Sequence, residues 1–284
     1  MRGIRLCIAS CLLGSLSNAE TLPVVEPLQI PSKTDSQEDK LIAIRDLQAK
    51  SILKNTVAKE ASLESVQNLR LDNAQISTIE GFEIFKNLNN LSLQKNFINN
   101  ITPIIQLKLL KTLDLSQNQI VVPAGICSLE QLESLDLSHN QLKYAFCCSF
   151  LALRYLKLIN NNIQQLIFIK DFNKLLEEID ISNNPVKNIV IKAPLLSLKK
   201  LSANATFITQ VSDLNHLPAL EELNLKNCIH LRSIAPLFYH IGDHWQCNLK
   251  HLKKLSISEE FLDKDSKNIL ANIKAQKNSK LIVL

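Results

Sequence analysis

The sequence contains little glycine and few large aromatic residues. Five glycines, three tyrosines and one tryptophan occur in 284 residues. With so few glycines there is no Gly-rich loop that could hold a phosphate group, and no serine lies in a nucleophile-elbow motif. We therefore expect a protein that is not an enzyme and that carries no cofactor.

The chain also lacks clustered charge of one sign. Its 32 basic and 27 acidic residues give a net charge of +5, and no block of five like charges occurs. Proteins that bind nucleic acids usually concentrate lysine and arginine on one face or in one segment. The charge pattern therefore gives no support to a nucleic-acid partner.

Long hydrophobic runs are absent as well. No segment approaches the ~20 apolar residues that a membrane-spanning helix needs, so we expect no transmembrane segment. Residues 1–19 instead combine two arginines, an apolar stretch and a small-x-small end, the three parts of a secretory signal. Its removal predicts a secreted or periplasmic protein. A buried N-terminal strand or helix, or lipidation at Cys11, is the alternative.

The cysteines do not form an evident disulfide framework. Cys7 and Cys11 would leave with the signal, and five would remain: Cys127, Cys147, Cys148, Cys228 and Cys247. An odd number is unsuited to complete pairing. Export into an oxidising compartment would still allow a pair to form, with at least one thiol left over.

One pattern recurs along most of the chain: apolar-x-x-apolar-x-apolar-x-x-Asn-x-apolar. It is clearest in residues 110–120 (LKTLDLSQNQI) and 132–142 (LESLDLSHNQL), and other copies begin at Val66, Leu88, Leu153, Leu176, Leu198, Leu220 and Leu252. Successive copies start 22, 22, 22, 21, 23, 22, 22 and 32 residues apart. The alternating apolar residues place one face of a short strand inward, and stacked copies can bury that face where a single copy cannot.

This pattern resembles the leucine-rich-repeat family, and its 22-residue period resembles the internalin-type class of bacterial proteins. The resemblance covers about two thirds of the chain. It implies an α/β solenoid, a horseshoe of about nine repeats with a parallel sheet on the concave side and turns or 3₁₀ segments on the convex side. The expected segments are a signal (1–19), a flexible linker (20–36), a helical N-terminal cap (37–65), the repeats (66–257) and a helix-strand C-terminal cap (258–284).

The asparagine of the motif has a structural reason. The chain turns in the interior at that point, and a side-chain amide offers both donors and an acceptor to the backbone groups there. The expected structural column is Asn96, Asn118, Asn140, Asn161 and Asn184. Ala74, Thr206, Cys228 and Glu260 replace asparagine in the other copies, and Cys228 is expected to be structural rather than reactive.

The exposed positions of the strands would form a grid on the concave side, where ligands of the family commonly lie. Its central column reads Arg70, Ser92, Asp114, Asp136, Lys157, Asp180, Ser202, Asn224 and Ser256. Tyr155 is the one aromatic residue of the grid, and interface hot spots favour tyrosine, tryptophan and arginine. We expect the centre of a binding face at Tyr155, with Arg154, Lys157 and Ile159 on the same strand and Asp136 and Asp180 beside it. Ordinary solvated strand residues are the alternative.

The adjacent carboxylates Asp114 and Asp136 could also suggest a catalytic or metal-binding pair. Such a pair needs a pocket and further ligands or a proton acceptor. An open grid does not supply them, so we expect a solvated face.

The 32-residue step marks an extended loop at 233–251. Within it His240, His244, Cys247 and His251 follow one another at spacings of four, three and four, which on a helix would align nitrogen and sulfur ligands for zinc. Gly242 and Asp243 weaken such a helix, and a loop whose aromatic residues pack on the convex side is the plainer interpretation. Trp245 and its neighbours could also form a second contact surface.

These observations predict a monomeric, exported module that binds a protein partner of unknown identity, similar to adhesins or exported effectors of bacteria. No ubiquitin-ligase domain is expected, because fewer than thirty residues follow the last repeat and none is cysteine. A metal-binding protein that uses residues 240–251, or an envelope structural protein without a discrete ligand, remains the alternative.

Overall fold

The computed structural model describes residues 44–57, 63–144, 150–168, 174–241, 244–276 and 281–284. The expected signal (1–19) and linker (20–36) lie outside these residues, as does part of the expected N-terminal cap. Among the described residues no helix is both long enough and apolar enough to cross a membrane.

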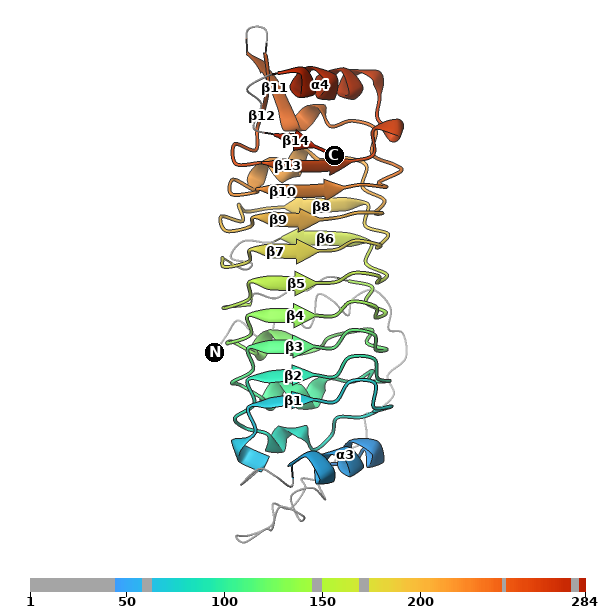
Figure 1. Ribbon diagram of the computed structural model, residues 1–284, viewed down its shortest axis with the longest axis vertical. Coiled ribbons are helices and arrows are strands. Elements are labelled where there is room, and N and C mark those ends of the chain that lie inside the picture. The colour runs from blue at the N-terminus through green and yellow to red at the C-terminus, as the bar shows by residue number, and fades with distance from the viewer. Residues whose placement is uncertain (1–43, 58–62, 145–149, 169–173, 242–243, 277–280) are drawn as a thin grey trace, which may run out of the picture.

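A single parallel sheet of ten strands extends along the molecule (Figure 1). Its first nine strands come one from each repeat, and β14 from the C-terminal segment adds the tenth. In sheet order they are β1 (Asn68–Arg70), β2 (Asn90–Ser92), β3 (Thr112–Asp114), β4 (Ser134–Asp136), β5 (Tyr155–Lys157), β7 (Glu178–Asp180), β9 (Lys200–Ser202), β10 (Glu222–Leu225), β13 (Lys254–Ile257) and β14 (Ile282–Val283). The nine-repeat solenoid predicted from the sequence is confirmed.

The motif leucines form the interior. Leu113 and Leu115 lie on either side of Asp114, the last residue of β3, and are both buried, and the equivalent pairs of the other repeats behave alike. Each repeat buries its apolar face against the repeats before and after it, so the core is one continuous column.

The side opposite the sheet consists largely of short 3₁₀ helices: η2 (Phe82–Ile84), η3 (Thr102–Gln106), η4 (Ile126–Ser128), η5 (Ser212–His216) and η6 (Ala235–Leu237). Two repeats depart from the expected turns and 3₁₀ segments. There β6 (Gln165–Phe168) and β8 (Asn188–Ile191) pair in parallel as a second, two-stranded sheet. Aromatic and β-branched residues such as Phe168 and Val190 favour strands, which explains this local difference.

Every repeat from the first to the eighth turns through the left-handed region at the same place. The residues concerned are Asn73, Lys95, Gln117, His139, Asn160, Asn183, Ala205 and Asn227, each with φ between 52° and 58°. A left-handed conformation is unfavourable for residues other than glycine and least so for asparagine. The turn must therefore be held by the contacts of the residue that follows.

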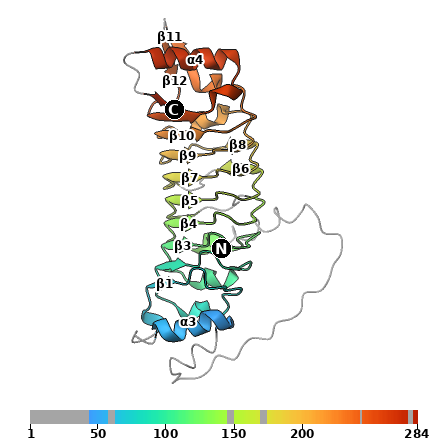
Figure 2. The ribbon, with the colours of Figure 1, turned by 45° about the vertical axis from the view of Figure 1, so that its right-hand side comes forward.

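Helical segments cover both ends of the stack (Figure 2). At the first repeat lie α3 (Leu47–Val57) and η1 (Leu63–Ser65), and at the last lie η7 (Glu259–Phe261) and α4 (Lys264–Ala275). Asp46 attaches α3 to the first repeat: one carboxylate oxygen accepts hydrogen bonds from Gln48 N and Ala49 N, and the other accepts from Ser77 N at 2.8 Å and from Thr78 N.

The long insertion forms a β-hairpin rather than an irregular loop. After η6, β11 (Phe238–Ile241) pairs antiparallel with β12 (His244–Cys247), and β12 packs against α4. Phe238 is buried, and Trp245 and Cys247 are half-buried against the core. The hairpin thus belongs to the covering of the last repeats.

Candidate partner-binding surface

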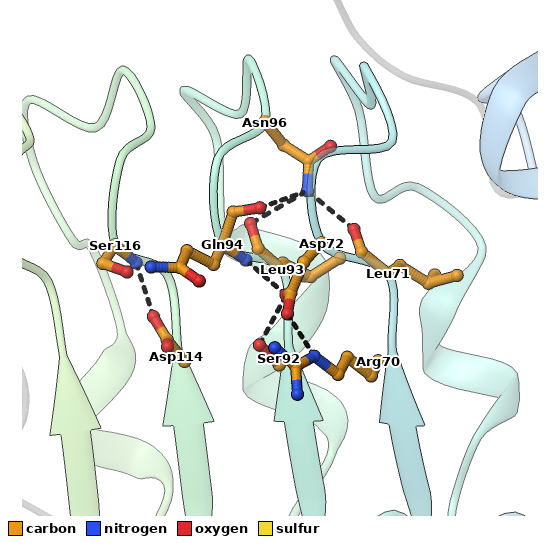
Figure 3. A network of polar contacts seen from close by, with 9 residues as sticks. All are labelled: Arg70, Leu71, Asp72, Ser92, Leu93, Gln94, Asn96, Asp114 and Ser116. Atoms are coloured by element: carbon orange, nitrogen blue, oxygen red, sulfur yellow. Dashed lines mark hydrogen bonds and ion pairs between the residues drawn. The ribbon is translucent and has the colours of Figure 1, made fainter.

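The asparagine column holds the turn at the end of each strand. The Nδ2 of Asn140 donates to Leu115 O at 2.9 Å and Leu137 O at 3.1 Å, and its Oδ1 accepts from Ile120 N at 2.9 Å. The same set of bonds recurs, shifted by one repeat, at Asn96, Asn118, Asn161 and Asn184. Figure 3 shows the amide of Asn96 between Leu71 and Leu93.

Thr206 and Cys228 occupy the same column in the seventh and eighth repeats. Thr206 Oγ1 donates to Ala203 O at 2.8 Å, and Cys228 Sγ lies 3.2 Å from the same carbonyl. Burial raises the pKa of the Cys228 thiol, which keeps it protonated at neutral pH.

Several aspartates expected on the open grid hold backbone turns. Oδ1 of Asp114 accepts from Ser116 N, that of Asp136 from Ser138 N and that of Asp180 from Ser182 N, each at 2.9 Å. These local bonds fix the chain as it leaves the strand. The three side chains are half-buried rather than fully solvated, and one oxygen of each is used within its own repeat.

The central column lies in one row across the sheet. Arg70 is aligned with Ser92, Ser92 with Asp114, Asp114 with Asp136, Asp136 with Lys157, and the register continues to Ser256. Arg70 contacts Asp72, whose carboxylate also accepts hydrogen bonds from Ser92 Oγ and Gln94 N (Figure 3). An open hollow of about 400 Å³ lies over β1 to β3 and is lined by Asn68, Arg70, Asn90, Ser92, Thr112 and Asp114, together with Leu69 and Leu91.

A second row, which the sequence analysis missed, carries charges of alternating sign. We call it the charge ladder: Lys111, Glu133, Arg154, Glu177, Lys199, Glu221 and Lys253. Arg154 and Lys199 both bind Glu177, and Lys253 binds Glu221 at 2.7 Å. Lys199 and Arg154 lower the pKa of Glu177, and Lys253 lowers that of Glu221. The ladder is visible in the sequence as the residue after the first leucine of the third to ninth repeats.

The residues expected at the centre of the binding face lie together. Tyr155 is 44% exposed on β5, aligned with Ser134 and Glu178 in the neighbouring strands. Arg154 precedes it in the ladder, and Lys157 Nζ lies 4.0 Å from Asp136 Oδ2. A smaller hollow of about 180 Å³ adjoins Tyr155 on the side of β7, β9 and β10.

Ile159 and Trp245 are less available than expected. Ile159 is half-buried just beyond the end of β5. The ring of Trp245 lies 5.1 Å from that of His240 in an edge-to-face contact, and its carbonyl accepts a hydrogen bond from Gln276. The exposed residues of β11 and β12 are instead Tyr239, His240, Ile241, His244 and Gln246.

The proposed zinc ligands do not share a helical face, because the segment is a hairpin. His240 is aligned with Trp245, and His244 with Ile241. Since alternate residues of a strand point to opposite sides, His240 and Cys247 share one side and His244 lies on the other, while His251 follows in a turn. Among the described residues no group of three or more His, Cys, Asp or Glu side chains could hold a metal ion. The helical arrangement on which the zinc hypothesis depended is wrong.

Among the described cysteines, Cys127 is disulfide-bonded, whereas Cys228 and Cys247 are free thiols. Burial raises the pKa of Cys247 as well, so neither free thiol is activated toward reaction.

Comparison with known proteins agrees with this geometry. The family model "Leucine rich repeat" matches residues 86–142. Internalin C2 of Listeria monocytogenes superposes with a TM-score of 0.63 and 26% identity over 77% of this chain and 96% of that one. The chain has the leucine-rich-repeat fold and is similar to proteins of the internalin type, as the sequence pattern predicts.

Two further structures share the leucine-rich-repeat fold. Internalin F of Listeria monocytogenes superposes with a TM-score of 0.60 and 20% identity over 86% of this chain and 76% of that one. A leucine-rich-repeat protein of Leptospira interrogans gives a TM-score of 0.56 and 21% identity over 78% and 61% of the two chains. A search of curated proteins found no match to this leucine-rich-repeat protein.

Proposed function

We propose that this leucine-rich-repeat protein is an exported binding module that docks a protein partner on the concave face of its sheet, with the contact centred on Tyr155. The observation that carries the proposal is an exposed aromatic side chain in the middle of an otherwise polar, regular sheet. Tyrosine contributes a large contact area at a small cost in side-chain entropy.

The surroundings of Tyr155 support this assignment. Arg154 and Lys199 are held by Glu177, and Lys200 lies 3.0 Å from Glu178. Side chains already fixed in this way lose less freedom when a partner docks. A polar rim around an aromatic anchor is the usual anatomy of a protein interface.

A role in binding rather than catalysis fits the same contacts. The neighbouring aspartates Asp114 and Asp136 cap turns, and the hollow beside Asp114 is open. Fold alone does not identify a partner, so the partner is defined here only as a protein. An adhesin-like or effector-like bacterial protein is the biological role we favour.

Export rests on two features. The first nineteen residues have the pattern of a secretory signal. The disulfide at Cys127 suits the periplasm or the exterior, where disulfides persist. We therefore place the mature protein, from about Glu20, outside the cytoplasm.

Affinity capture with the mature chain, followed by titration of the captured protein, tests the proposal. We expect Tyr155→Ala to weaken binding by about tenfold or more, as for an interface hot spot, and Lys157→Glu to weaken it as well. Tyr144→Ala is the matched control, because Tyr144 is 78% exposed and lies outside the strands of the sheet. Equal binding by the Tyr155 and Tyr144 variants would move the site off the concave face, and failure to capture any specific protein would favour an envelope structural role.

A further inference from the structure

An apolar stripe runs along one flank of the solenoid. It lies in the turns that lead into the strands, at the two residues before the first leucine of each repeat. From the fifth to the eighth repeat these turns are Leu151-Ala152, Lys174-Leu175, Leu196-Ser197 and Pro218-Ala219. Leu151, Leu175 and Leu196 are 63%, 41% and 69% exposed. We call these four turns the flank stripe.

The same turns are mostly polar elsewhere. The second to fourth repeats have Lys86-Asn87, Lys108-Leu109 and Glu130-Gln131, and the ninth has Lys250-His251. Exposed leucines scattered singly need no explanation, but a contiguous row on successive repeats marks a contact surface. The stripe is centred between the sixth and seventh repeats.

The charge ladder runs directly beside the flank stripe, since each of its members follows the first leucine after the turn. Consider a second copy that lies antiparallel against this flank, related by a two-fold axis between the sixth and seventh repeats. Each repeat n then faces repeat 13 minus n of the other copy, so an odd-numbered repeat always faces an even-numbered one. Because the ladder alternates in sign with each repeat, every base faces an acid.

The individual pairs follow from this symmetry. Glu177 of one copy faces Lys199 of the other, Arg154 faces Glu221, and Glu133 faces Lys253. In the stripe, Leu175 faces Leu196, and the Leu151 turn faces the Pro218 turn. Each contact occurs twice, as a two-fold interface requires. The charge pattern is satisfied by any two-fold axis that passes between two adjacent repeats, and the apolar stripe selects the one between the sixth and seventh.

The ladder also excludes any alignment whose axis passes through a repeat. A shift of one copy by one repeat would place base against base and glutamate against glutamate along the whole row. Strands of the sheet lie about 4.8 Å apart, so the mismatch would not average out over the contact. Like charges placed in contact at an interface disfavour that arrangement strongly.

We propose that this flank is the interface of an antiparallel homodimer. The two-fold axis places both concave faces on the same side. Arg154, Glu177 and Lys199 belong both to the surroundings of Tyr155 and to the dimer contact, but the dimer does not rest on the proposed function: it would remain even if the concave face bound nothing. This proposal differs from the monomer expected from the sequence.

Sedimentation equilibrium of the purified mature chain, at concentrations up to about 100 μM, tests the proposal over the affinity range of small interfaces. We expect a monomer-dimer equilibrium and a dimer dissociation constant that rises by about tenfold or more in Leu196→Glu. The matched control is Val122→Glu, because Val122 is 63% exposed and lies outside the flank stripe. Circular dichroism checks that both variants are folded.

A charge swap distinguishes the interface from a merely structural role of the ladder. Arg154→Glu and Glu221→Arg each break a pair within the chain, since Arg154 binds Glu177 and Glu221 binds Lys253. Each single variant should dissociate more readily, whereas the double variant restores the pair between copies and should regain the dimer. A monomer throughout the concentration range, a dimer unaffected by Leu196→Glu, or a double variant that dissociates more than either single variant would overturn the proposal.

Discussion

Replacing one asparagine of the column should loosen the solenoid at a defined point. In Asn140→Ala the buried N–H of Ile120 loses its acceptor, and the carbonyls of Leu115 and Leu137 each lose a donor. An unsatisfied buried N–H costs about 1 to 3 kcal/mol, and each lost carbonyl bond about 0.5 to 1.5 kcal/mol. We expect the free energy of unfolding to fall by about 2 to 6 kcal/mol.

Urea denaturation followed by far-UV circular dichroism measures this change, provided that the slope m stays constant. Gln141→Ala is the control: Gln141 is exposed next to Asn140, and the backbone bond that it makes to Ile120 O does not depend on its side chain. Asn140→Thr should lie between the two, because Thr206 shows that a hydroxyl can still donate to the carbonyl in this column. A loss below about 1 kcal/mol in Asn140→Ala, within the usual range of a surface substitution, would refute this account of the column.

Three further predictions concern the ends of the stack. Hydrogen bonds from Ala49, Ser77 and Thr78 outweigh the opposing effect of burial and lower the pKa of Asp46. The stabilisation by the Asp46 carboxylate is therefore present above the unfolded pKa of about 3.9 and is lost as pH falls through the lower folded pKa. Asp46→Asn should make thermal stability depend less on pH between pH 5 and pH 2, and an unchanged pH profile would count against the attachment of α3 by Asp46. Asp263 caps α4 by accepting from Ser266 N at 2.7 Å, so Asp263→Ala should destabilise the protein by about 1 kcal/mol in urea denaturation, and no measurable loss would show that the cap is dispensable. Elemental analysis of purified protein should find no stoichiometric zinc, because the hairpin separates the histidines; one equivalent of zinc would contradict this.

The repeat architecture could be predicted because its cause is local and periodic. Leu113 and Leu115 recur in equivalent form in each repeat, and only a stack buries all of them. The central column from Arg70 to Ser256 also follows from the motif alone, since the register of a repeat is set by its own apolar pattern.

The hairpin and the second small sheet could not be derived in the same way, since neither repeats. Spacings of three or four residues between the His and Cys side chains are compatible with a helix. The aromatic and β-branched residues of the same segment favour strands, and the segment forms a hairpin whose β12 packs on α4. The turn-capping role of the grid aspartates was missed for another reason. An aspartate two residues before a backbone amide in a turn is a local signal, but the same position also predicts a solvated side chain of an open sheet, and the pattern does not decide between the two.

The alternation of the charge ladder has a consequence for how partners arrive. Charges that change sign every ~4.8 Å produce a potential that decays within about 2 Å of the surface, far less than the ~8 Å over which physiological salt screens isolated charges. An approaching molecule therefore feels almost no pull or push from this row until it touches. Encounters along this edge should proceed at the ordinary rate of unsteered proteins, about 10⁵ to 10⁶ M⁻¹s⁻¹, and should change little with ionic strength.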